Sequence, residues 1–186
     1  MQQNKVEIVE VGARDGLQNE KEIISTEDKL QLIQRCIDAG SRRIEVASFV
    51  NPKRVPQMAD AEAILEALPD RPDVTYIGLV LNRRGAERAL ETRADELGAV
   101  AVASDGFGVR NQKQTSLESV DVAGEIVELA REHGRSAQVT VSTAFGCPFD
   151  GEVSVGHVLE VCRRLSAFRP REIALADTIG VAGPGQ

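Results

Sequence analysis

The stretch that decides the fold is VEIVEVGARDGLQNE, residues 6–20. Its first half alternates apolar with charged side chains, and this period of two predicts a β-strand over residues 6–11. The strand runs into GARDG, where Arg14 and Asp15 stand side by side. A doubly wound, nucleotide-binding sheet usually has G-x-G-x-x-G at this turn, and GARDG does not match that pattern. The charged pair is either a solvated turn or one half of an active site.

The overall composition is that of a globular protein, because 42% of the 186 residues are hydrophobic and 27% are charged. A formal net charge of −7 disfavours nucleic acid or an anionic membrane as the main partner, and we expect neither. No apolar run approaches the ~20 residues that span a bilayer, and the N-terminus lacks the apolar core of a signal peptide. Cys36, Cys147 and Cys162 are odd in number and contain no C-x-x-C pair, which predicts a reducing, cytoplasmic location.

Short β-branched runs alternate with amphipathic helical stretches along the chain. This alternation predicts parallel strands joined by helical crossovers, in a single domain over residues 1–186. We predict strands over residues 6–11, 43–47, 74–81, 99–103, 138–144 and 172–176. We predict helices over residues 26–39, 60–68, 84–92, 117–133 and 155–168.

Two parallel architectures compete for this pattern. GFGVRN at residues 106–111 is a weak match to a glycine-rich phosphate turn and would support a doubly wound sheet. Polar residues follow several strands instead: Arg14 and Asp15 the first, Glu45 near the end of the second, and Asp177 the sixth. Active sites at the carboxyl ends of several strands are typical of a (β/α)₈ TIM barrel, which we therefore predict. About six of the eight units are visible, so we expect a truncated barrel that lacks strands seven and eight.

Four of these residues have side chains suited to chemistry. Asp15 can ligate Mg²⁺ or Mn²⁺, and Arg14 beside it can stabilise a developing oxyanion. Glu45 lies within an apolar strand, where a carboxylate is costly unless it is paired. We expect burial and a neighbouring carboxylate to raise the pKa of Asp177, which would let it accept a proton. Taken alone, each position is explained about equally well by a polar residue in a turn.

The remaining candidates are weaker. Cys147 lies in AFGCPFDG, but interior cysteines are more often inert small hydrophobes, and no histidine is near it in sequence. We expect capping or surface roles for His133 and His157 rather than metal binding. Lys53 and Arg54 form a small basic loop after the second strand, which is either an exposed face or a contact for the phosphates of an anionic substrate.

Four ordered motifs resemble those of the 3-hydroxy-3-methylglutaryl-CoA lyases, within the DRE-TIM metallolyase superfamily. They are EVGARDGLQNEK, IEVASFVNPKRVPQMAD, FGCPFDGEVS and ALADTIGVAGPG, and the resemblance runs from Val6 to Gly185. The related condensing synthases typically carry RDGEQ, whereas RDGLQNE here is lyase-like. Ala13 stands where the lyases commonly have proline, which should affect the rigidity of the turn more than the chemistry.

The resemblance implies a (β/α)₈ barrel that cleaves 3-hydroxy-3-methylglutaryl-CoA to acetyl-CoA and acetoacetate. It implies a divalent metal ion, Mg²⁺ or Mn²⁺, an acyl-CoA substrate and a homo-oligomer when the protein is full length. The roles that it implies are a metal ligand at Asp15, the catalytic arginine at Arg14, site-lining residues at Gln18 and Glu45, and an acid near the reacting hydroxyl at Asp177. It also implies that the loops carrying Lys53 and Asn111 contact the acyl-CoA.

Other parts of the family's site are missing from the chain. The resemblance implies a His-x-His pair after a seventh strand, a later asparagine ligand, and a catalytic cysteine in a glycine-rich loop that is not Cys147. We therefore expect the chain alone to be inactive, and either poorly soluble or oligomeric because its edge strands are open. A lyase of a related acyl-CoA, a condensing synthase, and a non-catalytic barrel fragment remain alternatives.

Overall fold

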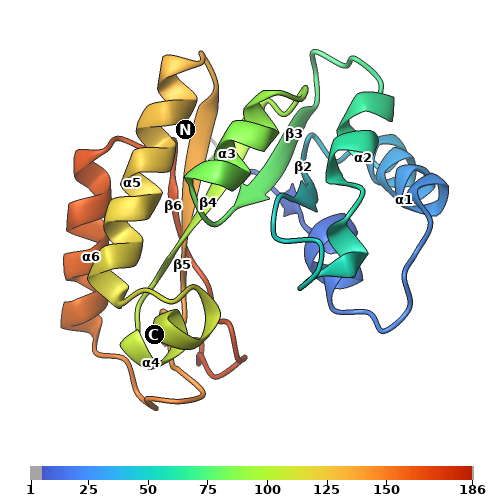
Figure 1. Cartoon of the computed structure of the whole chain (residues 1–186). Helices are drawn as coiled ribbons and strands as arrows, with labels where there is room; N and C mark the ends of the chain where they lie inside the picture. The colour runs from blue at the N-terminus through green and yellow to red at the C-terminus, as the bar shows by residue number, and fades with distance from the viewer. Residues whose placement is uncertain (1–5, 186) are drawn as a thin grey trace, which may run out of the picture.

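The computed structural model describes residues 6–185, which form one parallel sheet whose six strands follow each other in sequence order (Figure 1). A doubly wound sheet reverses its strand order at a switch point, so the uninterrupted order excludes that architecture. Each strand pairs in parallel with the next. The strands are β1 (Val9–Glu10), β2 (Arg43–Ser48), β3 (Thr75–Val80), β4 (Glu96–Val102), β5 (Ser136–Ser142) and β6 (Ile173–Leu175).

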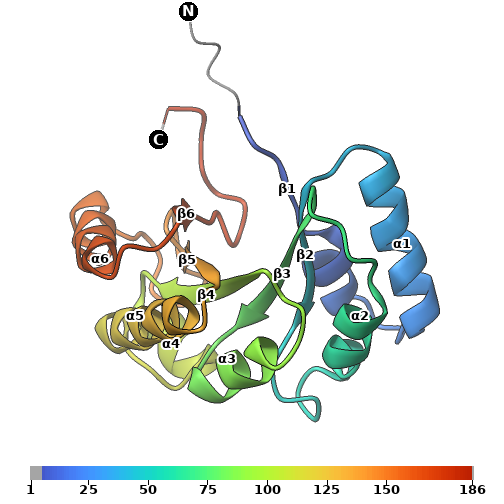
Figure 2. The same ribbon diagram turned by 90° about the horizontal axis from the view of Figure 1, so that it is seen from above.

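The helices lie on the outer side of the curved sheet, and the strands line its inner side (Figure 2). None of the described helices is both long enough and apolar enough to cross a membrane. A π-helical turn over Gly12–Gly16 and a 3₁₀ turn over Pro56–Met58 follow β1 and β2. The α-helices are α1 (Thr26–Asp38), α2 (Ala61–Ala67), α3 (Arg83–Leu90), α4 (Asp105–Asn111), α5 (Ser116–Glu132) and α6 (Val155–Ala167).

Helix α1 shows how the sequence specifies an element. The Ser25 side chain accepts a hydrogen bond from the backbone N–H of Asp28 at 3.1 Å and so caps the first turn. Ile33 and Ile37 are four residues apart and fully buried, which fixes the face that packs on the sheet. Gly40 follows the helix with φ of +106°, a conformation that side chains other than glycine rarely adopt.

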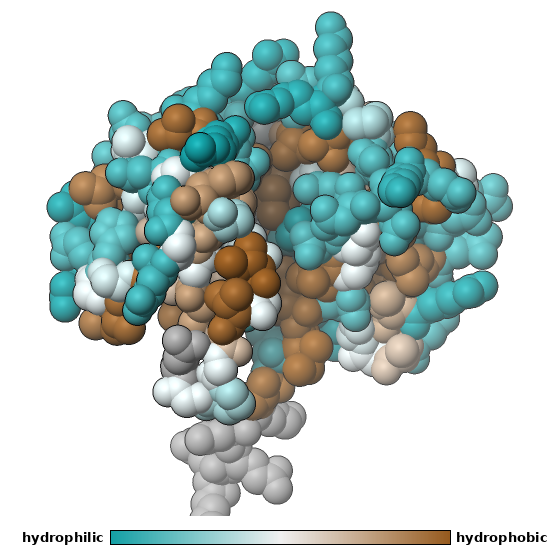
Figure 3. All heavy atoms as spheres, turned by 90° about the horizontal axis from the view of Figure 1, so that it is seen from below, coloured by the Kyte–Doolittle hydropathy of each residue, from teal (hydrophilic) through white to brown (hydrophobic). Residues whose placement is uncertain are grey.

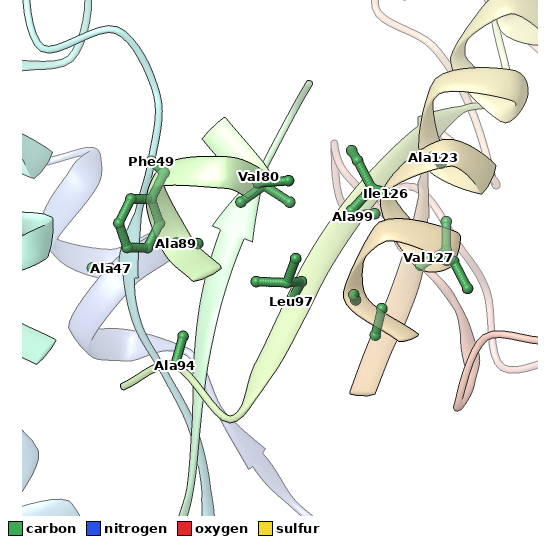
Figure 4. Packing of buried hydrophobic residues seen from close by; sticks show 14 of the residues in the cluster. Ala47, Phe49, Val80, Ala89, Ala94, Leu97, Ala99, Ala123, Ile126 and Val127 are labelled. Atoms are coloured by element: carbon green, nitrogen blue, oxygen red, sulfur yellow. The ribbon is translucent and has the colours of Figure 1, made fainter. Parts of the chain in front are cut away.

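The core lies between the outer face of the sheet and the helices. Figure 4 shows Ala123, Ile126 and Val127 of α5 beside Ala99 of β4. Small side chains on the strand let the helix approach closely, while the larger Leu97 fills the space and is fully buried. Truncation of such a residue to alanine typically costs about 2–5 kcal/mol.

Three parts of the chain differ from the sequence-based expectation. β1 contains two residues, and Val6 and Ile8 are 82% and 71% exposed, because β1 pairs with β2 on one side only. β4 begins at Glu96, three residues before the predicted start, because that acid is buried as part of the sheet. GFGVRN belongs to the unpredicted helix α4 and is therefore no glycine-rich phosphate turn.

Candidate active site

The π-helical turn after β1 brings Arg14 against β2. Its Nη1 lies 2.7 Å from Asp15 Oδ1, and its Nε donates to Oε1 of Glu45. The three side chains are 14%, 55% and 5% exposed in the order Arg14, Asp15 and Glu45. The guanidinium thus joins a buried carboxylate on β2 to an exposed one beside it. The expectation that Glu45 needs a partner is confirmed.

Glu45 lies deep in the sheet because its neighbour leaves room for it. A Cβ on Gly98 of β4 would lie 3.1 Å from Glu45 Oε2, so a side chain there would crowd the carboxylate. Burial raises the pKa of the Glu45 carboxyl, and the Arg14 guanidinium offsets this effect only in part. The pKa of Glu45 therefore lies above its usual value.

Gln18 joins the same two strand ends. The Ser48 hydroxyl at the end of β2 donates to Gln18 Oε1 at 2.9 Å. The next residue, Asn19, donates from its side-chain amide to the backbone carbonyl of Asp15 at 2.8 Å. The segment from residue 14 to residue 19 is therefore fixed at both ends, with the Asp15 carboxylate facing outward.

Asp177 follows β6 and is exposed. Its two carboxylate oxygens accept hydrogen bonds from the backbone N–H groups of Val181 and Ala182, each at 2.9 Å. The hydrogen bond from Ala182, followed by that from Val181, holds the pKa of Asp177 below its usual value. The expectation of a raised pKa is wrong, because the carboxylate is solvated and hydrogen-bonded rather than buried beside another acid. Within residues 6–185, no hydrogen bond or ion pair joins Asp177 to the Arg14 group.

The end of β5 carries strain that the sequence did not reveal. Thr143 is buried with φ of +57°, an uncommon conformation for a β-branched residue and one found at functional sites. Its N–H donates to Thr178 Oγ1 at 2.7 Å, which ties the end of β5 to the segment after β6. The preceding hydroxyl, Ser142 Oγ, is buried without a hydrogen-bond partner.

Cys147 stabilises a loop after β5. Its Sγ lies 2.8 Å from Ser104 Oγ and accepts longer hydrogen bonds from the N–H groups of Phe149 and Asp150. Burial raises the pKa of the thiol, but these hydrogen bonds outweigh burial and the pKa of Cys147 is lowered. Nε2 of His157 is 2.9 Å from Ser116 Oγ, so that histidine is engaged elsewhere. These contacts agree with a structural interpretation of Cys147.

Lys53 and Asn111 are exposed in segments that follow β2 and β4, and we call this edge of the barrel the rim. Lys53 is exposed in the connection between β2 and α2, and its backbone N–H donates to Asn51 Oδ1 at 3.0 Å. Asn111 is exposed at the last residue of α4. Figure 3 views the molecule from the side on which α4 lies and shows apolar surface in the middle, flanked by hydrophilic side chains.

Asp15 is the predicted metal ligand. Its carboxylate is exposed, and one of its oxygens accepts from Arg14. Among the residues that the structure describes, no group of three or more His, Cys, Asp or Glu side chains could hold a metal ion. Asp15 offers one oxygen ligand of the type that Mg²⁺ and Mn²⁺ prefer, but the described residues alone do not fit a complete site.

Comparison with known proteins identifies the family, since a sequence model described as HMGL-like matches residues 5–186. The chain belongs to the HMGL-like family. It is 42% identical over 181 residues to the Pseudomonas aeruginosa 3-hydroxy-3-isohexenylglutaryl-CoA/hydroxy-methylglutaryl-CoA lyase. It is also 42% identical over 181 residues to the mitochondrial hydroxymethylglutaryl-CoA lyase of Bos taurus. Both alignments cover 97% of the chain but 60% and 56% of these relatives, so the HMGL-like chain spans less than two-thirds of their length.

Solved structures of the HMGL-like family share the fold. The hydroxymethylglutaryl-CoA lyase of P. aeruginosa superposes with a TM-score of 0.92 at 42% identity, covering 97% of this chain and 60% of that one. An HMG-CoA lyase from Acinetobacter baumannii, in complex with coenzyme A and 3-methylmalate, superposes with a TM-score of 0.91 at 37% identity, covering 97% and 59%. This likeness confirms the prediction of a partial (β/α)₈ barrel with six strands.

Proposed function

We propose that the protein to which this chain belongs is a carbon–carbon lyase that cleaves 3-hydroxy-3-methylglutaryl-CoA to acetyl-CoA and acetoacetate. The observation that carries the proposal is Arg14, which follows β1 and bridges the exposed Asp15 beside it to Glu45, buried in the middle of β2. Catalytic groups of TIM barrels come from such strand ends. The family and the names of its lyase relatives support the same reaction.

The reaction sets requirements that these side chains can meet. A base takes the proton of the tertiary hydroxyl, the carbon–oxygen bond becomes the carbonyl of acetoacetate, and the electrons of the broken carbon–carbon bond move to the enolate oxygen of acetyl-CoA. That enolate is then protonated. The Arg14 guanidinium is suited to stabilise the enolate oxygen, and loss of one such donor typically lowers kcat by about 10²–10³.

The other residues act around Arg14. Glu45 holds the guanidinium in one orientation through their ion pair, and Gln18 borders the same opening. Asp177 is the proposed proton acceptor on the family resemblance alone, since its lowered pKa leaves it ionised but makes it a weaker base than the raised pKa expected from the sequence. Lys53 and Asn111 contact the acyl-CoA from the rim.

A divalent ion would make the substrate hydroxyl more acidic when bound. Asp15 would provide one oxygen ligand, and the other ligands would have to come from residues outside those described here. We propose Mg²⁺ or Mn²⁺, because both prefer oxygen donors.

The setting of the protein is also proposed. A solved family member in complex with coenzyme A supports an acyl-CoA ligand. Three free cysteines fit the predicted cytoplasmic location, and the lyase names in this family include cytoplasmic and mitochondrial forms. A homo-oligomer remains the predicted assembly of the full-length protein.

The test is an assay of acetoacetate formation with Mg²⁺ or Mn²⁺, on the protein produced from its complete reading frame and on the 186-residue chain alone. We expect activity in the first and none in the second. Absence of acetoacetate from a correctly folded complete protein would contradict the proposal. A longer branched acyl-CoA is the second substrate to assay, because the P. aeruginosa relative is named for two acyl-CoA substrates.

A further inference from the structure

Lys29 of α1 is fully buried, with 2% of its side chain exposed. Lysines are almost never fully buried unless they are paired. Its ammonium lies 2.7 Å from Asp60 Oδ1 and donates to the backbone carbonyl of Gln57 at 2.5 Å. Both acceptors belong to the connection between β2 and α2, so the buried charge joins α1 to a loop on another βα unit.

Two neighbouring hydrogen bonds make the same link. Thr26 Oγ1 at the start of α1 donates to Asp60 Oδ2 at 2.8 Å, and Gln57 Nε2 donates to the carbonyl of Glu20 at 2.8 Å. We name these four side chains, Thr26, Lys29, Gln57 and Asp60, the latch. The latch ties the β1–α1 connection to the β2–α2 connection, and α1 and α2 lie side by side in both views (Figures 1 and 2).

The latch is the outer of two links between these connections. The inner link is the hydrogen bond from Ser48 to Gln18, close to the strand ends. Between the two links, the β2–α2 connection carries Lys53 and Arg54, which are exposed and have no ion pair within the described residues. The bonds of this part of the loop all lead to Asn51: the N–H groups of Arg54 and Val55 donate to its carbonyl, and the N–H of Lys53 donates to its side chain. Its position therefore depends on what anchors its far end.

We propose that Lys29 is a positioning residue that holds the β2–α2 connection so that Lys53 and Arg54 face the phosphate groups of the acyl-CoA substrate. The second half of this statement rests on the proposed function. The first half rests on the contacts alone. Without the ammonium, the Gln57 carbonyl and the Asp60 carboxylate lose their shared partner, and the far end of the loop is held only by the weaker Thr26 and Gln57 hydrogen bonds of the latch. In the proposed complex, Lys53 and Arg54 then lose the position from which they meet the phosphate groups.

Hydrogen exchange on the protein from its complete reading frame tests the latch directly. Lys29→Met removes the ammonium, and Arg35→Met removes a cation from the exposed face of the same helix as a matched control. In Lys29→Met we expect the amide hydrogens of Arg54, Val55 and Met58 to exchange about tenfold faster, with those of β4 and β5 unchanged. Arg35→Met should match the wild type. Unchanged exchange in the loop, or a uniform increase across the sheet, would overturn the proposal.

Gln57→Ala is a milder variant in case Lys29→Met folds poorly. It removes the side-chain link to Glu20 and leaves the backbone carbonyl that Lys29 binds. The same loop amides should exchange faster by a smaller factor. Equal exchange in Gln57→Ala and the wild type would show that the hydrogen bond from Gln57 to Glu20 does not hold the loop, which would count against the proposal.

The proposed role of Lys53 and Arg54 is tested by comparing KM for two substrates, with the protein from its complete reading frame. We expect Lys29→Met to raise KM for the CoA thioester about tenfold with kcat nearly unchanged, because the phosphate contacts are displaced. KM for the matching pantetheine thioester, which lacks the nucleotide phosphates, should stay the same. An equal rise for both thioesters would show a merely structural role and overturn the positioning of Lys53 and Arg54. If the wild type cleaves neither thioester, the proposed function fails, whereas the exchange experiment still decides whether the latch exists.

Discussion

The two ends of the barrel differ in whether their charged side chains are buried and paired or face solvent. Where the strands begin, Arg43 is buried and contacts Glu96 at 2.5 Å, Glu7 and Glu172 at 3.0 Å, and Gln138 at 3.1 Å. Where the strands finish, the carboxylates of Asp15 and Asp177 face solvent, and Ser142 Oγ is buried without a partner. The first end, called the satisfied end below, pairs its buried charges with one another, although Arg43 Nε is buried without a hydrogen-bond partner. The second, called the open end, turns carboxylates to solvent, where a ligand can reach them, as is typical of TIM barrels.

The satisfied end also joins the two edges of the open sheet. Arg171, which precedes β6, lies 3.1 Å from Glu7, which precedes β1, and 2.9 Å from the fully buried Glu96. The ion pair between Arg171 and Glu7 joins the segments that lead into β1 and β6, the two edge strands of the curved sheet. Burial disfavours the charged form of Arg43, but hydrogen bonds to Glu172 and Glu96 outweigh burial, and the pKa of Arg43 is raised. This network therefore holds together a sheet that has no strand between its edges.

The largest expected effect is at the satisfied end. Arg43→Met leaves buried carboxylates without their central cation, and loss of one partner of a buried pair costs about 3–5 kcal/mol. Urea denaturation of the protein from its complete reading frame measures this loss. The matched control is Arg42→Met, because Arg42 is the adjacent residue, is half exposed and pairs with Asp73 at 3.5 Å. We expect the control to lose at most about 1 kcal/mol. Equal losses in the two variants would contradict the contrast between the ends.

At the open end, substitution should affect activity. Arg14→Gln in the protein from its complete reading frame should lower kcat by about 10²–10³, or roughly 2.7–4 kcal/mol, because the enolate oxygen loses its donor. Steady-state assays of acetoacetate formation measure this effect. Arg83→Gln is the control, since Arg83 pairs with Glu87 on the exposed face of α3. A rise in KM with kcat unchanged would show that Arg14 binds the substrate without stabilising the transition state.

The pH dependence of stability should distinguish the carboxylates of Glu45 and Asp177. Because the pKa of Glu45 is raised, the folded state binds its proton at pH values where the unfolded chain has released it. Glu45 therefore makes stability fall as pH rises from its usual pKa to its raised one. Asp177 has a lowered pKa, so its contribution is present above the usual pKa of aspartate and is lost as pH falls through the lowered one.

Denaturation between pH 3 and pH 8, a range spanning about the usual carboxyl pKa values, measures both slopes. Glu45→Gln should remove the decline on the rising side, and Asp177→Asn should remove the decline on the acid side. Identical profiles for the two variants would contradict the opposite environments assigned to these acids.

The barrel was predictable because local periodicity reports which faces of a segment are buried. The alternation of strands and helices, and the end of α1 at Gly40, depend on neighbours within a few residues. The need of Glu45 for a partner was predictable for a related reason: a charge inside an apolar run has to be compensated. In each of these cases the deciding interaction can be inferred without knowing the rest of the fold.

The remaining features depend on contacts that sequence does not display. Glu96 belongs to β4 because Arg43, 53 residues earlier, neutralises it. The pKa of Asp177 depends on how the backbone after β6 turns back to donate two N–H groups. The left-handed conformation of Thr143 has no local signal, because threonine is a residue that normally avoids it. Lys29 resembled an ordinary residue of an amphipathic helix until the fold set it against the β2–α2 connection.

The smallest expected effect has the opposite sign from the others and concerns two buried serines. The Ser142 hydroxyl has no partner, so Ser142→Ala removes an uncompensated buried group and should raise stability by about 0.5–1 kcal/mol. The matched control is Ser116→Ala, because the buried hydroxyl of Ser116 donates to the carbonyl of Val102 at 2.7 Å. That variant should lose about 1 kcal/mol in the same urea titration. If Ser142→Ala also loses stability, the Ser142 hydroxyl has a hydrogen-bond partner in solution. The polar groups of the open end would then be paired much as those of the satisfied end are.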